Sequence, residues 1–200
     1  MSILDMTPMQ LDALREVGNI GAGNGATALS QLLNKKVDMT VPSVNIIPFE
    51  EVFAGDGTEK VVIGIIVRVL GDTPGNILFV LEKDTAMQII KDLTGEESEQ
   101  LSEMGNSVLC EIGNIIASSY MNAIAKFTNL VITPSVPAVS YDMLGAILST
   151  TFIESGQFDD QVLDLETRFL QYNGEEISGH FYYIPMPGSL EKILNTLGVN

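Results

Sequence analysis

The amino-acid sequence contains two copies of one pattern, 95 residues apart. EVGNI at 16–20 corresponds to EIGNI at 111–115, and the alignment continues without a gap to VPSV at 41–44 and VPAV at 136–139. Two copies of a long unit indicate duplication and fusion, whereas a solenoid is built from several short repeats. The chain is therefore expected to fold with an internal pseudo-twofold axis.

Each half has the same predicted order: a long helix, a set of strands and a short closing helix. Alternating apolar runs predict strands, and the short helices follow at 84–95 and 189–198. The strand runs are 59–70 and 75–82 in the first half, and 161–172 and 177–185 in the second. Short turns at 71–75 and 173–176 favour antiparallel pairing.

These elements predict an α+β fold in which long helices pack on an antiparallel β-sheet with pseudo-twofold symmetry. We expect a single domain spanning 1–200, made of halves at about 1–95 and 96–200 and joined by an acidic linker at 93–105. Since the duplication already supplies the symmetry that a single-copy relative would obtain by dimerising, we expect a monomer.

Charge restricts the partners of this chain. Ten Lys and Arg against 26 Asp and Glu give a net charge of -16, which repels nucleic-acid phosphates and anionic lipid surfaces. A protein with a basic face or a reactive Lys is a better match. The longest apolar run, 61–70, is too short to cross a bilayer, and the first ten residues lack a signal-peptide pattern. We expect a cytoplasmic protein with no membrane insertion.

Cysteine and histidine each occur once, as Cys110 and His180. An intramolecular disulfide and a Cys/His zinc cluster are thereby excluded, and no metal site or cofactor of its own is expected. His180 lies in a strand-like apolar run, which favours a structural partner for its ring over a catalytic role.

The first long helix is expected at 8–33, where Thr7 can cap the N-terminus and Gln10 can complete a capping box. Four glycines interrupt this helix. Gly18, Gly21 and Gly25 fall on its apolar stripe, and each costs roughly 1 kcal/mol relative to Ala in a helix interior. Close approach of another element is the natural compensation. Gly23 lies on the other face, where a small residue would let a partner surface come near.

The same glycines satisfy the dinucleotide-binding pattern G-x-G-x-x-G/A at 21–26. That pattern binds a pyrophosphate only where a strand turns into a helix N-terminus, and here the preceding residues are helical by pattern. The second copy also replaces the glycines with Ile116, Ser118 and Tyr120. We therefore reject nucleotide binding.

The residues common to both polar faces are an acid or hydroxyl, then Glu, then Asn. They are Asp12, Glu16 and Asn19 in the first copy, and Ser107, Glu111 and Asn114 in the second. Spacings of four and three place each trio on one helical face. Duplication could have copied a merely solvated face, but Asn is a mediocre residue in mid-helix, so a functional role is the alternative.

The full pattern, D/S-x3-E-x2-N-x22-P, ends at Pro42 and at Pro137. It resembles the CheC family of bacterial chemotaxis phosphatases, which includes CheX and FliY. The resemblance covers essentially the whole chain, and two intact copies are typical of the CheC branch.

The resemblance implies a phosphatase that hydrolyses the aspartyl phosphate of the response regulator CheY. It assigns Asn19 and Asn114 to placing the attacking water, and Glu16 and Glu111 to docking the Lys of the regulator, which carries its own Mg²⁺. Asp12 and Ser107 would tune the helix face. Pro42 and Pro137 would fix how the chain enters the following strand, although ordinary strand-start prolines would explain them equally well.

The family also implies a second partner, the receptor deamidase CheD, which stimulates the phosphatase. We assign CheD binding to the segment 141–148, as a short amphipathic helix with Asp142 exposed; a buried core segment is equally plausible. The alternative function is a non-catalytic adaptor that binds CheD and phosphorylated CheY, for which Glu substitutions would matter and Asn substitutions would not.

Overall fold

The computed structural model describes residues 7–48, 57–95, 97, 100–155, 161–171 and 176–198. The predicted turn at 173–176 lies mostly outside these residues. The first half contains α1 (Pro8–Leu33), β1 (Val37–Pro48), β2 (Val61–Gly71), β3 (Gly75–Glu82) and α3 (Lys83–Thr94). The second half contains α4 (Glu103–Thr128), β4 (Ile132–Pro134), β5 (Ala138–Met143), α5 (Leu144–Ser155), β6 (Gln161–Gln171), β7 (Glu176–Pro185) and α6 (Ser189–Thr196).

The strands form one antiparallel sheet, which confirms the predicted fold class. Its order is β1-β6-β7-β3-β2-β4, with β5 also paired to β2. The central pair, β3 and β7, joins the two halves, with Phe79 opposite Phe181. Each half also gives its outer strand to the other, because β1 pairs with β6 while β4 and β5 pair with β2.

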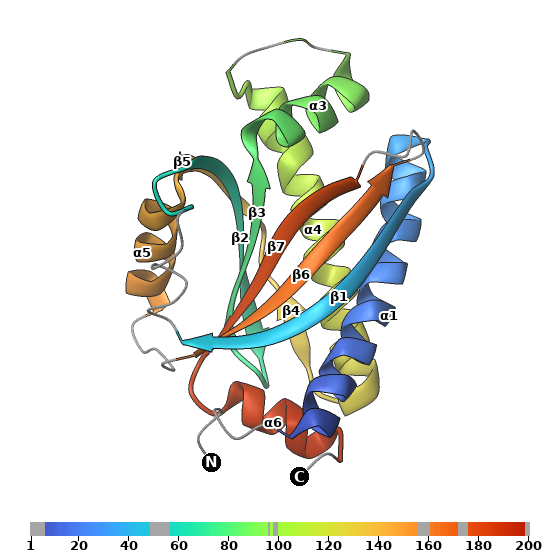
Figure 1. Cartoon of the computed structure of the whole chain (residues 1–200), viewed down its shortest axis with the longest axis vertical. Coiled ribbons are helices and arrows are strands. Elements are labelled where there is room, and N and C mark those ends of the chain that lie inside the picture. The colour runs from blue at the N-terminus through green and yellow to red at the C-terminus, as the bar shows by residue number, and fades with distance from the viewer. Residues whose placement is uncertain are drawn as a thin grey trace.

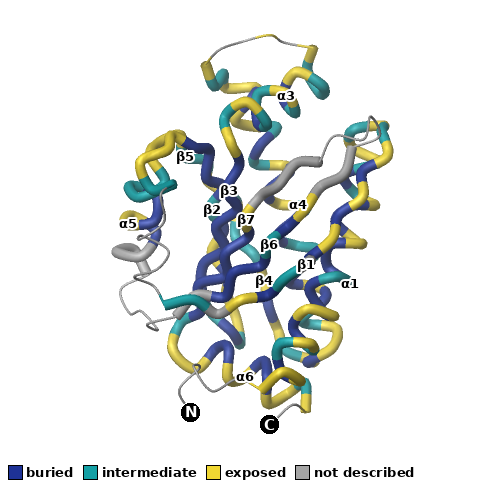
Figure 2. The backbone as a smooth tube through the Cα atoms, viewed as in Figure 1, coloured by how far each residue is buried: buried dark blue, intermediate teal, exposed yellow. Residues whose placement is uncertain are grey.

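Helices α1 and α4 cover one face of the sheet, and α5 covers part of the other face, beside β2, β3 and β7 (Figure 1). Alternate residues of β2, β3 and β7 join α1 and α4 in the main core, and the intervening residues of these strands join α5 in a smaller one. Both faces of β3 are therefore buried, which explains its continuous apolar run. Figure 2 shows the dark blue centre of the sheet and the exposed outer sides of the helices.

The long helices α1 and α4 begin and end at positions 95 residues apart. Thr7 and Ser102 cap their N-termini, and the predicted capping box between Thr7 and Gln10 is present. Asn34 and Asn129 end the helices in the left-handed conformation, with φ of 48° and 53°. Because Ser102 already caps α4, that helix begins inside the predicted linker, which is therefore shorter than 93–105.

Each glycine of the α1 stripe lies close to another element, as predicted. Gly21 and Gly25 approach α4, whereas a Cβ atom on Gly18 would lie 3.1 Å from Cδ2 of Leu165 in the sheet. A Cβ atom on Gly21 would lie 2.8 Å from Cδ1 and 2.9 Å from Cα of Tyr120, and one on Gly25 would lie 3.6 Å from the Ser119 side chain. The two helices thus pack at a distance that a larger residue at position 21 would prevent. A Cβ on Gly23 would meet nothing within 4 Å. The stretch is continuous helix, so the pattern at 21–26 is not at a strand-to-helix turn.

Helix α4 is apolar because it is a core helix. Among the described residues it is the single helix long and apolar enough to cross a membrane, and half of that stretch is buried in the protein interior. Its buried residues pack against α1 and the sheet, with Leu109, Ile116 and Met121 at most 1% exposed.

Candidate functional site

The first motif copy lies on the outer side of α1, and its Asn is bonded to the backbone of β1. The Val41 N–H donates to Asn19 Oδ1 at 2.9 Å, while Asn19 Nδ2 donates to Val41 O at 3.4 Å and to Arg15 O at 3.1 Å. Val41 itself is 1% exposed. In this copy the amide ties strand to helix.

The two acids of the first copy are exposed, as predicted, but differ in their contacts. Asp12 accepts a hydrogen bond from the guanidinium of Arg15 at 2.8 Å. Glu16 has no hydrogen-bond or ion-pair partner among the residues that the structure describes. The Arg15 cation, one position before Glu16, reduces the negative potential that would attract a Lys.

The second motif copy, on α4, presents its groups to solvent. Asn114 is exposed, and its one hydrogen bond within the described structure is from the Ser118 hydroxyl to Oδ1, at 3.4 Å. Glu111 is exposed and, within the same described ranges, unpaired. Ser107 donates to the Glu103 carbonyl one turn earlier, at 3.1 Å. Here both the amide and the carboxylate are available to a partner.

The difference between Asn19 and Asn114 arises in the segments VPSV at 41–44 and VPAV at 136–139. In β1 the segment lies at a register shift between Thr40 and Ser43, inside a continuous strand. In the second half, residues 135–137 separate β4 from β5, the two strands that pair with β2, and Val136 is 87% exposed. The Cys110 thiol, rather than an amide, reaches this segment, through the Pro137 carbonyl at 3.6 Å. Burial raises the pKa of that thiol.

The two motif prolines have different surroundings. Pro137 directly precedes β5, as expected of a residue that sets the path into a strand. Pro42 lies within β1, so the expectation that it precedes a strand is wrong for the first copy. The cause is the tie to Asn19, which holds Val41 in line with the strand and lets the pairing continue past the proline. The Pro42 side chain lies outside the described residues.

The segment 141–148, expected to be an amphipathic helix, is half strand. Residues 141–143 end β5, and α5 begins at Leu144. Asp142 is exposed, and its Oδ1 accepts the Met143 N–H at 2.7 Å. Ile147 and Leu148 are buried in the smaller core. The expected helix therefore starts two residues after Asp142, because β2 extends the strand through Val61 opposite Met143.

The lone histidine has a structural partner. His180 Nδ1 lies 3.4 Å from Asp164 Oδ1, on the neighbouring strand, and the ring stacks on Tyr182. The hydrogen bond to Asp164 raises the pKa of His180, partial burial lowers it, and the charges of Asp164 and Glu166 raise it further. This pair lies on the sheet face opposite α1 and α4.

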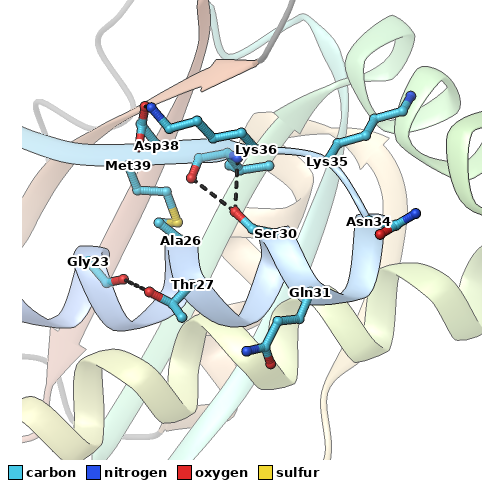
Figure 3. Close-up of a pocket in the computed structure, with 11 residues that line it drawn as sticks. Gly23, Ala26, Thr27, Ser30, Gln31, Asn34, Lys35, Lys36, Asp38 and Met39 are labelled. Atoms are coloured by element: carbon cyan, nitrogen blue, oxygen red, sulfur yellow. Dashed lines mark hydrogen bonds and ion pairs between the residues drawn. The ribbon is translucent and has the colours of Figure 1, made fainter.

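Sequence reasoning missed a groove beside the first motif copy. The groove, of about 640 Å³, runs along the C-terminal half of α1 and the start of β1 (Figure 3). The Ser30 hydroxyl both accepts from and donates to the backbone of Val37 inside the groove, at 2.9 and 3.2 Å, while Lys35 at its end donates to Asp92 of α3 at 2.9 Å. Gly23, one helical turn after Asn19, lines the end of the groove nearest the motif face. Neither the groove nor the role of Val41 has a sequence signal, because both depend on where β1 lies. The ion pair of Arg15 with Asp12 could have been predicted, because the two residues are three apart on one helix.

No group of three or more His, Cys, Asp or Glu side chains that could hold a metal ion occurs among the described residues. The site therefore consists of carboxylates, amides and hydroxyls on two helices. Such a site can dock a cation and orient a water molecule, and it holds no strong nucleophile or base.

Comparison with known proteins relates both motif copies to one family. The model of the CheC-like family matches residues 9–46 and 104–141. The chain is 39% identical to the CheY-P phosphatase CheC of Bacillus subtilis, over 96% of this chain and 95% of that protein. The chain belongs to the CheC-like family.

Two further relatives extend the CheC-like assignment. The flagellar motor switch phosphatase FliY of Bacillus subtilis is 33% identical over 68% of this chain, a match that covers 36% of FliY. The crystal structure of Thermotoga maritima FliY has a TM-score of 0.77 with 20% identity, covering 97% of this chain and 98% of that one. At this identity the structural likeness establishes the CheC-like fold alone.

Proposed function

We propose that this protein is a phosphatase that hydrolyses the aspartyl phosphate of the chemotaxis response regulator CheY. The observation that carries the proposal is the exposed pair on α4: Glu111 and Asn114 lie one turn apart, and no backbone group of the described residues bonds to either side chain. The 39% identity to a CheY-P phosphatase over nearly the whole chain supports the substrate.

The proposed chemistry divides the work between the two proteins. The regulator supplies the aspartyl phosphate together with a bound Mg²⁺ and a Lys, which neutralise charge on the phosphoryl group. Asn114 donates to and accepts from a water molecule and holds it in line with the P–O bond, which lowers the entropic cost of attack. The Glu111 carboxylate pairs with the Lys of the regulator and fixes where Asn114 points.

The first copy has the same residues in a less available state. Asn19 must release the Val41 N–H before its amide can orient a water, and Arg15 stands beside Glu16. We therefore assign most of the turnover to Asn114 and a docking role to Glu16. The protein would act in the cytoplasm with its regulator, as a monomer, with CheD as an activating partner at the exposed end of β5 that holds Asp142.

The test is the decay of phosphorylated CheY with catalytic amounts of this protein. We expect Asn114→Ala to remove most of the activity, Asn19→Ala to remove less, and the double variant to match spontaneous decay. Asn122→Ala, an exposed Asn on the same helix, is the matched control and should leave the activity unchanged. Glu111→Gln should raise KM, because the docking charge is lost.

The adaptor function is the alternative, and the hydrogen bonds that hold the Asn19 amide on the Val41 backbone favour it for the first copy. The adaptor function predicts that phosphorylated CheY decays at the same rate with the double Asn variant as with the wild type. It also predicts that Glu16→Gln and Glu111→Gln abolish binding. A wild-type protein that adds nothing to spontaneous decay, with and without CheD, would decide for the adaptor.

Asp142→Lys tests the proposed CheD site. Unchanged capture of CheD by this variant would contradict that site.

A further inference from the structure

Two exposed methionines occupy equivalent places at the starts of the long helices. Met9 is 68% exposed on α1 and Met104 is 55% exposed on α4, 95 residues later. Single exposed apolar residues are ordinary on protein surfaces. A matched pair at one place in both copies needs a closer look, because most of the helix surface differs between the copies.

The residues shared by α1 and α4 include a buried set and a smaller exposed set. Of the helix positions exposed in both copies, two carry the same residue: Met9 with Met104, and Glu16 with Glu111. The other positions exposed in both carry different residues: Pro8 and Glu103, Asp12 and Ser107, Thr27 and Asn122, Gln31 and Lys126, and Leu32 and Phe127. The methionine, like the docking glutamate, is thus present in both copies at an exposed helix position.

Helix geometry places each methionine in line with its glutamate. Seven residues separate Met104 from Glu111, which is within about 20° of two full turns and about 10 Å along the axis. Position 118, a further seven residues on, is Ser118, and its counterpart is Gly23. Each helix therefore presents one stripe: an apolar end, a carboxylate in the middle and a small residue at the far end.

We propose that Met9 and Met104 are apolar anchors for the receiver domain of the phosphorylated regulator, each contacting an apolar patch about 10 Å from the Lys that pairs with the glutamate. This inference rests on the proposed function. The occupant follows from charge, because an unpaired carboxylate on a protein of net charge -16 selects a partner that presents a cation. Methionine suits this role since its flexible side chain adapts to a partner surface.

The anchor acts before chemistry, so its loss should affect binding alone. It contacts the partner equally in the ground state and the transition state, and such uniform binding changes KM without changing kcat. It also gives the docked helix a second fixed point, which sets the direction of the helix across the regulator. One carboxylate contact would leave that direction free.

The experiment compares the wild type with a double variant that carries both Met9→Gln and Met104→Gln. Gln keeps the length and the helix propensity of Met. The matched control is Leu32→Gln with Phe127→Gln, which removes two exposed apolar residues that are also 95 apart but lie about 140° from the methionines around the helix. We expect KM for phosphorylated CheY to rise roughly five- to tenfold in the Met variant, with kcat and the melting temperature unchanged, and the control to match the wild type.

A second readout separates this inference from the proposed function. Methyl NMR of the nine methionines, with beryllofluoride-activated CheY as the probe, should shift the Met9 and Met104 signals and leave that of Met143 in place. Unshifted Met9 and Met104 signals despite binding, or an equal KM effect in the control variant, would overturn the anchor. A wild-type protein without phosphatase activity would overturn the proposed function. The NMR shifts would still show whether Met9 and Met104 contact CheY.

Discussion

The side-chain amide of Asn19 is bonded at both ends to the backbone of Val41. Val41 N–H donates to Oδ1 at 2.9 Å, and Nδ2 donates to the Val41 carbonyl at 3.4 Å. The corresponding residues, Asn114 and Val136, are both exposed. One sequence pattern therefore has two structural states, in which the same amide either supports a strand or faces solvent.

The first prediction concerns stability at the two asparagines. Asn19→Ala should lower the free energy of unfolding by about 1–2 kcal/mol, because it leaves the buried Val41 backbone without its partner. Asn114→Ala should leave it within about 0.5 kcal/mol, as expected of an exposed side chain. Urea denaturation measures both. Equal losses in the two variants would mean that Val136 is held by Asn114 in solution.

The second prediction uses two glycines of α1 that differ in their surroundings. Gly21→Ala should destabilise the protein by about 1–3 kcal/mol, because its Cβ would meet the Tyr120 backbone at 2.9 Å and force α1 away from α4. Gly23→Ala should stabilise it by up to about 1 kcal/mol, since that Cβ enters open space and Ala favours the helix. Thermal melts of both variants provide the check, and a stabilised Gly21→Ala would contradict the close packing.

The third prediction concerns the two halves, which we propose form one folding unit. A fragment of residues 1–95 keeps the pairing of β2 with β3 but loses β6 beside β1, β7 beside β3, and β4 and β5 beside β2. Its apolar strands would then have exposed edges. The fragment should be unfolded or self-associated, and should regain structure when co-expressed with 96–200. A folded, monomeric 1–95 in sedimentation and circular dichroism would contradict this.

The fourth prediction is a pH dependence from His180. Asp164 raises the pKa of this histidine in the folded state, and the charge of Glu166 raises it further. Arg168 donates a hydrogen bond to Glu166 and offsets part of the effect of that charge. Because the folded pKa exceeds 6.5, the contribution to stability is fully present below about pH 6.5 and is lost as the pH rises through the folded value.

The measurement compares the wild type with His180→Gln in urea at about pH 6 and about pH 8. The wild type should exceed the variant in stability by more at the lower pH, and the difference should shrink at the higher one. Asp164→Asn should remove most of this pH dependence. A difference that grows with pH would show that burial, rather than Asp164, dominates the titration.

The sequence alone predicted much of this protein, because its strongest signals are local or repeated. The offset of 95 residues fixed the two halves, and the capping box at Thr7 and the glycine stripe fixed α1 and its packed face. The Glu and Asn positions followed from comparing the copies. Each of these signals depends on residue type and helical spacing, which are readable without knowing what lies across the interface.

The tertiary structure decided what the two motif copies do. The copies agree at Glu, Asn and Pro, yet Val41 is buried and bonded to Asn19 while Val136 is exposed. The outcome depends on strand pairing between the halves: β1 continues through its register shift along β6, whereas β4 and β5 break apart along β2. Such pairing joins residues that are more than 60 positions apart along the chain, and more than 100 apart for β1 with β6. The state of each amide is therefore set by long-range contacts that a local sequence pattern does not contain.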